Sequence, residues 1–381
     1  MEFRAINRFG MEENMTKKNA ALWLICFALL LLLPRAVWTV ASERFATDAT
    51  ETTLTTQVPK LTKENYKTYA ASAENYFNSN VPFRSQLISL NSLMDVKLFR
   101  EKSINDKVVI GDNNWLFYSA ESDIEDYKGT NLFTQEQLEV IADNLLTSKT
   151  YLDNREIEFV VFLAPNKETI YGEENLPSYY KKGELTRAQQ LVQYLEENTD
   201  VRIVYPEEEM KAYKDDYSLY WHYDTHWNAA GGYIGGSALL KELGIEMPPA
   251  EEMTFTPDDF SGYDLARMMN LEEYYEKNMP AEINYIVTGY NGNNLQAVSI
   301  DDATALVYHS DSPNGKKLFM VRDSFGGGMA GVLASNFSDS YMAHWNGFFN
   351  QAQIDEQDPD VFVLELVERR LDYLYTFRLS D

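Results

Sequence analysis

The pattern of apolar and polar residues divides the chain into helical segments near the N-terminus and a longer part in which buried strands alternate with helices. Residues 61–77 and 83–99 place apolar side chains three and four positions apart, which predicts two helices. Two short apolar runs at 107–111 and 115–118 are joined by the turn-prone sequence Asp-Asn-Asn. They predict a β-hairpin.

Four continuous apolar runs predict strands that are buried on both faces of a sheet. They lie at residues 157–165, 201–206, 317–324 and 360–367. A helix is predicted from Thr134, because Thr134 and Gln137 have the spacing of a capping box, and another over 185–197. This alternation predicts an α/β domain with a mainly parallel central sheet flanked by helices. Residues 248–290 show no regular pattern and are expected to be an insertion.

One segment, residues 20–40, is apolar except for an interruption at Pro34 and Arg35. Its length is close to the roughly 20 residues of a membrane span, and Lys17 and Lys18 precede it, as expected of a cytoplasmic flank. We predict a cytoplasmic N-terminus over 1–19 and a signal-anchor helix over 20–40. The alternative is a cleaved signal peptide and secretion. Independently of that choice, a start at Met15 rather than Met1 would give the n-region MTKK.

The residues after this segment predict an exported domain on a linker. Residues 41–60 are rich in threonine and lack periodicity, which is typical of a linker. Residues 61–381 contain no second linker and no internal repeat, and we expect them to form one extracytoplasmic domain.

Composition restricts the partners and the chemistry of this domain. The formal net charge of −26 argues against binding to nucleic acid, because a phosphate backbone requires a basic surface. The single cysteine, Cys26, lies in the apolar segment, which excludes disulfides within the chain and cysteine-based zinc sites.

Two of the four histidines lie in the sequence YWHYDTHWNAAGG, residues 220–232. His222, Asp224 and His226 alternate, so in an extended segment their side chains would share one face. Asn228 is placed to cap a helix through the residues that follow. We therefore expect the histidines where a strand or loop meets a helix, at the sheet edge where α/β proteins bind ligands.

A second candidate is the sequence FMVRDSFGGGMAGVL, residues 319–333. It predicts a strand that ends at Ser324, a tight turn and then a helix, whose N-terminal N–H groups can stabilise an oxyanion. Serine needs a base to take its proton, and histidine is the usual one. We therefore predict Ser324 as nucleophile, His226 as general base and Asp224 as the residue that orients His226.

Five segments in a fixed order resemble the AlgX/AlgJ-like group of SGNH hydrolases, which includes the DHHW proteins and the alginate O-acetyltransferases. They are VVIGDNNWLFY, FLAPNKETIYGEENLP, YDTHWNAAGGY, VRDSFGGGM and DVFVLELVERRL. The Asp-x-His and the later Ser of this group form its catalytic triad, and they match Asp224, His226 and Ser324. Thr225 stands where the DHHW motif has its first histidine, and the order of the triad is reversed relative to other SGNH enzymes.

The resemblance implies an exported or membrane-anchored enzyme that moves acetyl groups onto a cell-surface or secreted polysaccharide. It also implies a partner, a membrane-bound O-acyltransferase that supplies the acetyl groups, and no metal or organic cofactor. SGNH enzymes complete the oxyanion hole with an Asn side chain and a Gly amide. The candidates for oxyanion or substrate binding are Asn166, Lys167, Gly326, Arg322 and His222.

Each of these candidates also has a structural interpretation. Asn166 fits a turn after Pro165, Lys167 fits a solvated surface, and Arg322 fits an ion pair with an acid such as Glu365. His222 is expected either to contact substrate or only to pack beside the site.

Three other functions remain open at this stage. His222, Asp224 and His226 have ligand types that suit zinc, although no further ligand shows motif spacing. The same triad would serve a carbohydrate acetyl esterase if water resolved the acyl-serine. A non-catalytic polysaccharide-binding protein is the third, and it would keep its function after Ser324→Ala.

Overall fold

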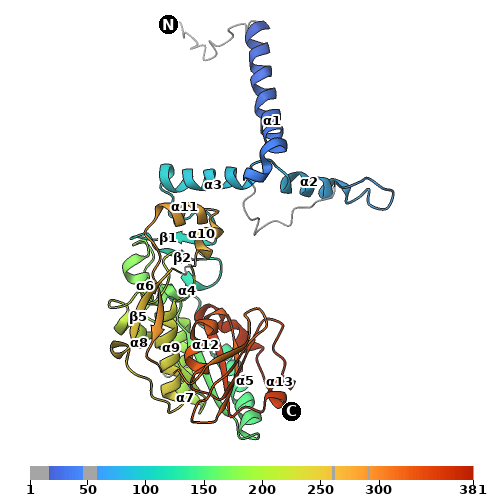
Figure 1. Ribbon diagram of the computed structural model, residues 1–381. Coiled ribbons are helices and arrows are strands. Elements are labelled where there is room, and N and C mark those ends of the chain that lie inside the picture. Colours follow the sequence, from blue (N-terminus) through green and yellow to red (C-terminus); the bar gives the residue numbers. More distant parts are fainter. Residues whose placement is uncertain (1–16, 46–57, 260–261, 291, 381) are drawn as a thin grey trace, which may run out of the picture. The chain divides into compact units, whose positions relative to one another are not determined.

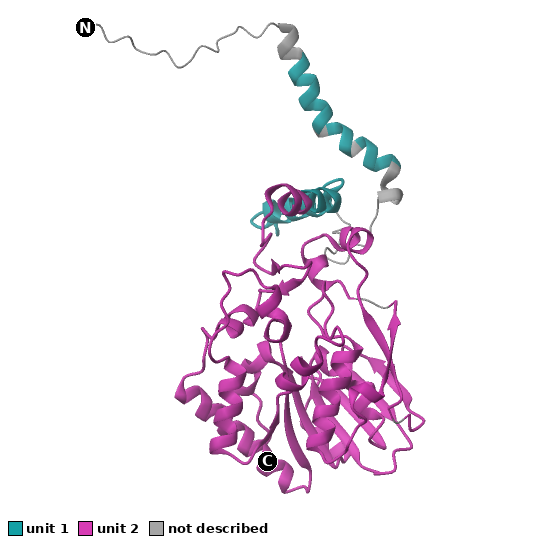
Figure 2. Ribbon diagram, turned by 90° about the vertical axis from the view of Figure 1, so that its left-hand side faces the viewer, with its two compact units in different colours: residues 1–91 teal, residues 92–381 magenta. Residues whose placement is uncertain are grey.

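The computed structural model describes residues 17–45, 58–259, 262–290 and 292–380, and the chain divides into two compact units, residues 1–91 and 92–381 (Figures 1 and 2). In the first unit, helix α1 (Lys17–Phe45) contains Leu22–Val40, a stretch of 19 residues with mean hydropathy 2.0 and none of it buried. By length and composition it can cross a membrane, as predicted for an anchor, and a signal sequence has the same properties.

The two helices expected after the linker are present. The first, α2 (Tyr69–Ser79), is shorter than predicted, whereas α3 (Arg84–Met94) continues as the π-helix η1 (Asp95–Phe99) to the predicted end. Residues before Tyr69 form turns instead, because polar side chains bond the local backbone: the Asn65 Oδ1 accepts from the Thr62 amide at 2.8 Å, and its Nδ2 donates to the Lys60 carbonyl. Such bonds compete with helix formation.

A seven-stranded sheet forms the centre of the second unit. The order is β4-β3-β11-β9-β10-β8-β7; the first five strands are parallel, and β8 and β7 are antiparallel to their neighbours. In this order the strands are Arg202–Val204, Glu158–Ala164, Val361–Val367, Lys317–Arg322, Asp339–His344, Ala305–His309 and Gln296–Asp301. The prediction of an α/β domain with a mainly parallel central sheet is confirmed.

Helices cover both faces of this sheet, which explains why its central strands are continuously apolar. Val160 and Phe162 of β3 pack in one core with residues of α9 (Ala229–Glu242) and α12 (Ser324–Ala334). Val161 and Leu163 pack in the opposite core with α5 (Gln135–Asp153) and α7 (Arg187–Asn198). The capping box of Thr134 and Gln137 at the start of α5 is present as predicted.

The segment 248–290 has more regular structure than the sequence predicted. It contains the 3₁₀ turn η2 (Ala250–Glu252), strands β5 (Thr254–Asp258) and β6 (Asn284–Thr288), which pair antiparallel, and helices α10 (Asp264–Met268) and α11 (Glu272–Asn278). The predicted hairpin is β1 (Val108–Ile110) with β2 (Leu116–Tyr118). The other elements are η1 (Asp95–Phe99), α4 (Asp123–Lys128), α6 (Lys167–Asn175), α8 (Glu207–Tyr213), α13 (Ala352–Gln357) and η3 (Glu368–Tyr375).

Helices α9 and α12 touch through their backbones, and two glycines make this possible (Figure 1). A Cβ at Gly232 would lie 2.2 Å from the carbonyl oxygen of Gly328, and a Cβ at Gly328 would lie 2.3 Å from the Trp227 Nε1. Each glycine costs about 1 kcal/mol of helix stability relative to alanine. The contact brings the N-terminus of α9, capped by Asn228 as predicted, next to the N-terminus of α12.

We expect Gly328→Ala to destabilise the protein by about 1–3 kcal/mol, because the added methyl overpacks a rigid contact. The matched control is Gly331→Ala on the same helix, where the nearest heavy atom would lie 3.8 Å from the new Cβ. That variant should be neutral or slightly more stable. Thermal unfolding of both variants tests this expectation; an equal response of the two would contradict the packing role of Gly328.

Candidate active site

Ser324 is the first residue of α12, and Asp323 alone separates it from strand β9; the predicted order of strand and helix is present, but the helix begins at Ser324 without the tight turn predicted after it. Asp323 caps the helix: its Oδ1 accepts from the Phe325 amide at 2.8 Å, and its Oδ2 accepts from the Val367 amide at 2.7 Å. These bonds fix the turn between strand and helix. Because the first amides of a helix have no intrahelical acceptor, Ser324 lies beside donors that favour negative charge.

The three predicted catalytic residues lie in one hydrogen-bonded chain. The Ser324 Oγ is 2.8 Å from the His226 Nε2, and the His226 Nδ1 is 2.7 Å from the Asp224 Oδ1. The same Asp224 oxygen accepts the backbone amide of His226 at 3.0 Å. This arrangement places the proton of neutral His226 on Nδ1 and leaves Nε2 free to accept the serine proton.

The charges of Asp224 and His226 stabilise each other. Burial favours the neutral carboxylic acid, but the hydrogen bonds and charge of His226 outweigh it and lower the pKa of Asp224 to about 2. Burial likewise favours neutral His226, yet the bond to Asp224 and its charge raise the pKa of His226 above the ordinary value. Asp224 is therefore a carboxylate that stabilises the protonated base.

The expectation that His222, Asp224 and His226 share one face of an extended segment is wrong. Residues 222–226 form a bent loop, closed by an isolated bridge between Tyr220 and Trp227. The His222 ring packs on Trp115, with centroids 4.2 Å apart, and its Nδ1 is 3.2 Å from the Glu282 Oε2. His222 therefore contacts a different part of the insertion from His226.

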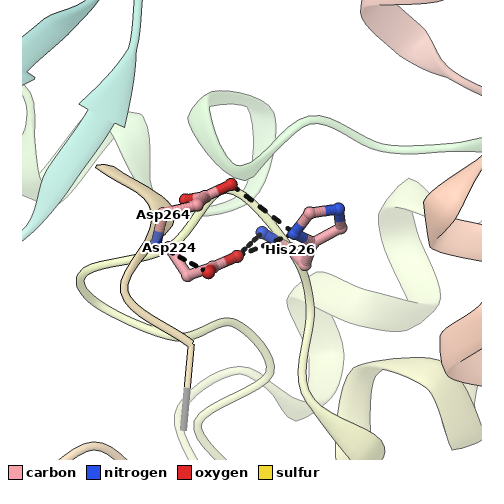
Figure 3. A group of neighbouring side chains, drawn as sticks. All are labelled: Asp224, His226 and Asp264. Carbon is pink, nitrogen blue, oxygen red and sulfur yellow. Dashed lines mark hydrogen bonds and ion pairs between the residues drawn. The ribbon is translucent and has the colours of Figure 1, made fainter. Parts of the chain in front are cut away.

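A second carboxylate, which the sequence reasoning missed, lies behind the histidine. Figure 3 shows Asp264 on the same side of the His226 ring as Asp224, with its Oδ2 3.7 Å from Nδ1. Asp264 accepts two hydrogen bonds from Thr225, and its own amide donates to the Asp224 Oδ2 at 2.9 Å. Burial and the negative charge of Asp224 raise the pKa of Asp264.

The predicted oxyanion candidate Asn166 stands at the N-cap position of α6 without a capping bond from its side chain, and it is fully buried. Its Oδ1 accepts from the Arg369 amide at 3.3 Å, and its backbone amide donates to the Glu368 Oε2 at 3.0 Å. Among the described residues its Nδ2 has no hydrogen-bond acceptor. A buried donor without an acceptor is uncommon in a native structure, which sets this amide apart from the other polar groups around it.

Lys167 lies in the interior rather than on a solvated surface. Its Nζ donates to the carbonyls of Trp221, His222 and Asp224, at 3.2, 3.3 and 2.6 Å. Burial lowers the pKa of Lys167, although carboxylates around it, Glu168 first, oppose that effect. The three donors of the ammonium group hold the loop that carries Asp224.

Arg322 is the last residue of β9, and Gly326 lies in the first turn of α12. Arg322 is fully buried, and its Nη1 is 2.8 Å from the Asp302 Oδ1, so its acidic partner is Asp302 rather than the predicted Glu365. A Cβ at Gly326 would lie 2.7 Å from both the Arg322 Cβ and the Glu365 Oε2. Gly326 thus allows the helix to approach the end of the sheet closely.

Arg369 is a further residue near the site, and the sequence analysis did not single it out. Its guanidinium lies over the rings of Phe325 and Tyr118, 5.2 and 5.5 Å from the centroids, and pairs with Asp123 at 3.5 Å. Phe325 in turn packs on the His226 ring at 5.1 Å. No short sequence motif marks Arg369, because its neighbours come from distant segments.

The residues that could bind a metal ion in this region differ from the three that the sequence suggested. Asp224, His226 and Asp264 each offer one ligand atom, all within 4.8 Å of one another, whereas His222 is not in the group. All four carboxylate oxygens already accept hydrogen bonds from protein N–H or O–H groups. The protein's own donors therefore satisfy these carboxylates.

The family model of the SGNH hydrolase-like domain of the acetyltransferase AlgX matches residues 108–306, more than half of the chain. The chain belongs to this family. The matched residues include Asp224 and His226, and Ser324 lies beyond them. A search of curated protein sequences finds no match.

Solved structures with a similar fold include Bacillus cereus PatB1 with a sulfonyl adduct, at a TM-score of 0.51 and 16% identity, covering 71% of this chain and all of PatB1. A DHHW family protein from Eubacterium siraeum has a TM-score of 0.49 at 14% identity, covering 72% of this chain and 99% of that protein. The O-acetyltransferase domain of Pseudomonas putida AlgJ has a TM-score of 0.42 at 17% identity, covering 73% of this chain and 94% of that domain. At these identities the likeness to PatB1 shows the SGNH-like fold alone.

We expect His226 to titrate above the ordinary histidine pKa of about 6.5 and Asp224→Asn to lower its pKa, because the carboxylate stabilises the imidazolium. Imidazole ¹⁵N resonances followed by NMR against pH measure this. Asp339→Asn, beside the exposed His309, is the control and should leave His226 unchanged. A His226 pKa below about 6.5 in the unmodified chain would contradict the described pairing.

Proposed function

We propose that this chain is an extracytoplasmic O-acetyltransferase that moves an acetyl group, through an acetyl-serine, onto a hydroxyl of a cell-surface or secreted polysaccharide. The observation that carries the proposal is the chain of hydrogen bonds from Ser324 through His226 to Asp224 at the N-terminus of a helix. The family to which the chain belongs is named for an acetyltransferase, which supports acetyl as the group that is transferred.

In the first half of the reaction the Ser324 Oγ attacks the carbonyl carbon of an acetyl ester while the His226 Nε2 takes its proton. The tetrahedral oxyanion collapses, the bond to the leaving alcohol breaks, and His226 returns the proton to that alcohol. In the second half a sugar hydroxyl attacks the acetyl-serine, His226 takes the proton of that hydroxyl, and collapse returns a proton to the Ser324 Oγ. Atoms and protons balance over the cycle without a cofactor.

The oxyanion would be stabilised by backbone amides at the start of α12 and by the Nδ2 of Asn166. The amide of Phe325 already donates a hydrogen bond to Asp323, so the Ser324 and Gly326 amides are the candidate oxyanion donors at the start of α12. Support for Asn166 comes from its buried Nδ2, which lacks an acceptor among the described residues. Each such donor is worth roughly 10²–10³ in kcat in enzymes of this kind.

The proposed location and partners follow from α1 and from the resemblance to the AlgX/AlgJ-like group. A signal-anchor helix would hold the domain outside the cytoplasm, where acetyl-CoA is not available. A membrane-bound O-acyltransferase would then supply the acetyl donor, and polysaccharide would be the acceptor. Cleavage of the N-terminal segment as a signal peptide would instead release the domain.

We expect the full-length chain in detergent, treated with an activated acetyl ester, to form an acetyl adduct on Ser324. Peptide mass spectrometry locates the adduct. Ser324→Ala and His226→Ala should reduce ester turnover by on the order of 10³-fold or more, and Asp224→Asn by on the order of 10²–10⁴-fold. Ser338→Ala is the control and should behave as the unmodified chain. Acetylation of another residue, or turnover that survives His226→Ala, would contradict the mechanism.

A second experiment separates transferase from esterase activity, since both pass through the same acetyl-serine. Donor consumption and free acetate are measured with and without oligosaccharide acceptors. A transferase should accelerate donor consumption and yield acetylated sugar, because the sugar hydroxyl competes with water. Acetate as the only product, whatever the acceptor, would instead show an acetyl esterase.

A further inference from the structure

Residues 222–226 form the loop that carries His226, and we call it the histidine loop. A short segment of the insertion, residues 262–266, packs against this loop, and we call it the strap. The amides of Leu265 and Ala266 donate to the Tyr223 carbonyl at 3.1 and 3.3 Å. The Asp264 amide donates to the Asp224 Oδ2. A Cβ at Gly262 would lie 2.4 Å from that same Asp224 oxygen, so the strap approaches the loop as closely as a backbone can.

Thr225 links the strap to the catalytic histidine. Its amide donates to the Asp264 Oδ1 at 2.7 Å, and its hydroxyl donates to the Asp264 Oδ2 at 2.6 Å. The Thr225 Oγ1 is also 3.2 Å from the His226 Nδ1. A hydroxyl has one hydrogen and two lone pairs. With its hydrogen on Asp264, Oγ1 presents a lone pair to Nδ1.

The Asp224 Oδ1 accepts the hydrogen bond of the His226 Nδ1 at 2.7 Å, and the other two oxygens nearby, the Thr225 Oγ1 at 3.2 Å and the Asp264 Oδ2 at 3.7 Å, present no hydrogen to it. This environment favours the tautomer with hydrogen on Nδ1. If the Thr225 hydroxyl were free to turn, it would donate to Nδ1 and stabilise the tautomer with hydrogen on Nε2. That tautomer cannot accept a proton from Ser324.

We propose that Asp264 is a positioning residue that fixes the catalytic tautomer of His226 by holding the hydrogen of the Thr225 hydroxyl. Asp264 acts through Thr225, and it contacts neither serine nor substrate in this role. The proposal rests on the proposed function of His226 as general base. It also explains why threonine is compatible with this position in this chain: the strap supplies the acceptor that orients its hydroxyl.

The test uses the full-length chain at the pH plateau of its ester turnover. In Asp264→Asn the amide NH₂ can donate to Oγ1 and turn the hydroxyl hydrogen toward Nδ1. We expect kcat to fall about tenfold with KM within about twofold of the unmodified value, because Asp264 contacts the loop that carries His226 and not Ser324. The imidazole ¹⁵N shifts should show hydrogen moving from Nδ1 to Nε2.

Thr225→Val gives the decisive comparison, because it removes the hydroxyl that acts as the wrong donor. The double variant Thr225→Val/Asp264→Asn should have a kcat at least about threefold higher than that of Asp264→Asn alone. If the two substitutions only damaged the structure, their losses in kcat would instead add, and the double variant would be slower than either single one. Thr225→Ser keeps the hydroxyl and should retain kcat. Glu272→Gln, which breaks the exposed Arg267–Glu272 pair of the same insertion, is the matched control and should change nothing.

Three results would overturn the proposal: hydrogen on Nε2 of His226 in the unmodified chain, unchanged kcat and ¹⁵N shifts in Asp264→Asn, or a double variant slower than Asp264→Asn. The first is measured without any variant, so the proposal stays testable if Asp264→Asn fails to fold. Retained turnover in Ser324→Ala would instead contradict the proposed function, and the ¹⁵N measurement of the tautomer would still decide the role of Asp264.

Discussion

The backbone contact between α9 and α12 is the constraint on which the candidate site depends. Gly232 and Gly328 let the two helices meet without side chains between them, and the Trp227 Nε1 donates to the Phe325 carbonyl at 3.0 Å across the same contact. The histidine loop ends where α9 begins, and Ser324 starts α12. Two segments almost 100 residues apart thus place His226 and Ser324 within hydrogen-bonding distance.

Buried carboxyl groups support two neighbouring starts of helices, the turn before Ser324 and the start of α6 at Asn166. The Glu365 Oε2 accepts the Asp323 amide at 3.0 Å, and the Glu368 Oε2 accepts the Asn166 amide and the Thr169 hydroxyl. Burial, followed by nearby negative charge, raises the pKa of Glu365, and it raises the pKa of Glu368 to about 8. With a pKa of about 8, Glu368 can be neutral at pH 7, which avoids a buried charge while the group still accepts hydrogen bonds.

The sequence predicted the central strands, whose burial is complete, but it wrongly predicted burial on both faces for β4, a half-buried strand at the edge of the sheet. It missed features that depend on contacts between distant segments. Strands β3, β9 and β11 are continuous apolar runs because helices cover both faces. Strand β7 is exposed at most positions and β10 begins with Asp339 and Ser340, so neither has the pattern of a buried strand. Ser324, His226 and Asp224 could be identified from the sequence, because the proposed reaction requires a nucleophile, a base and an acid that orients the base. Asp264 could not, since nothing in local spacing connects α10 to the histidine loop.

The central claim is that Ser324 is the nucleophile at an oxyanion site formed by α12 and Asn166. The most direct measurement is an experimental structure of the full-length chain after reaction with a small sulfonyl fluoride, which mimics the tetrahedral intermediate. The account predicts a covalent bond to the Ser324 Oγ and a sulfonyl oxygen within hydrogen-bonding distance of the Asn166 Nδ2 and an α12 amide. An unreacted Ser324 beside a modified residue elsewhere, or a sulfonyl group that points away from both donors, would contradict it.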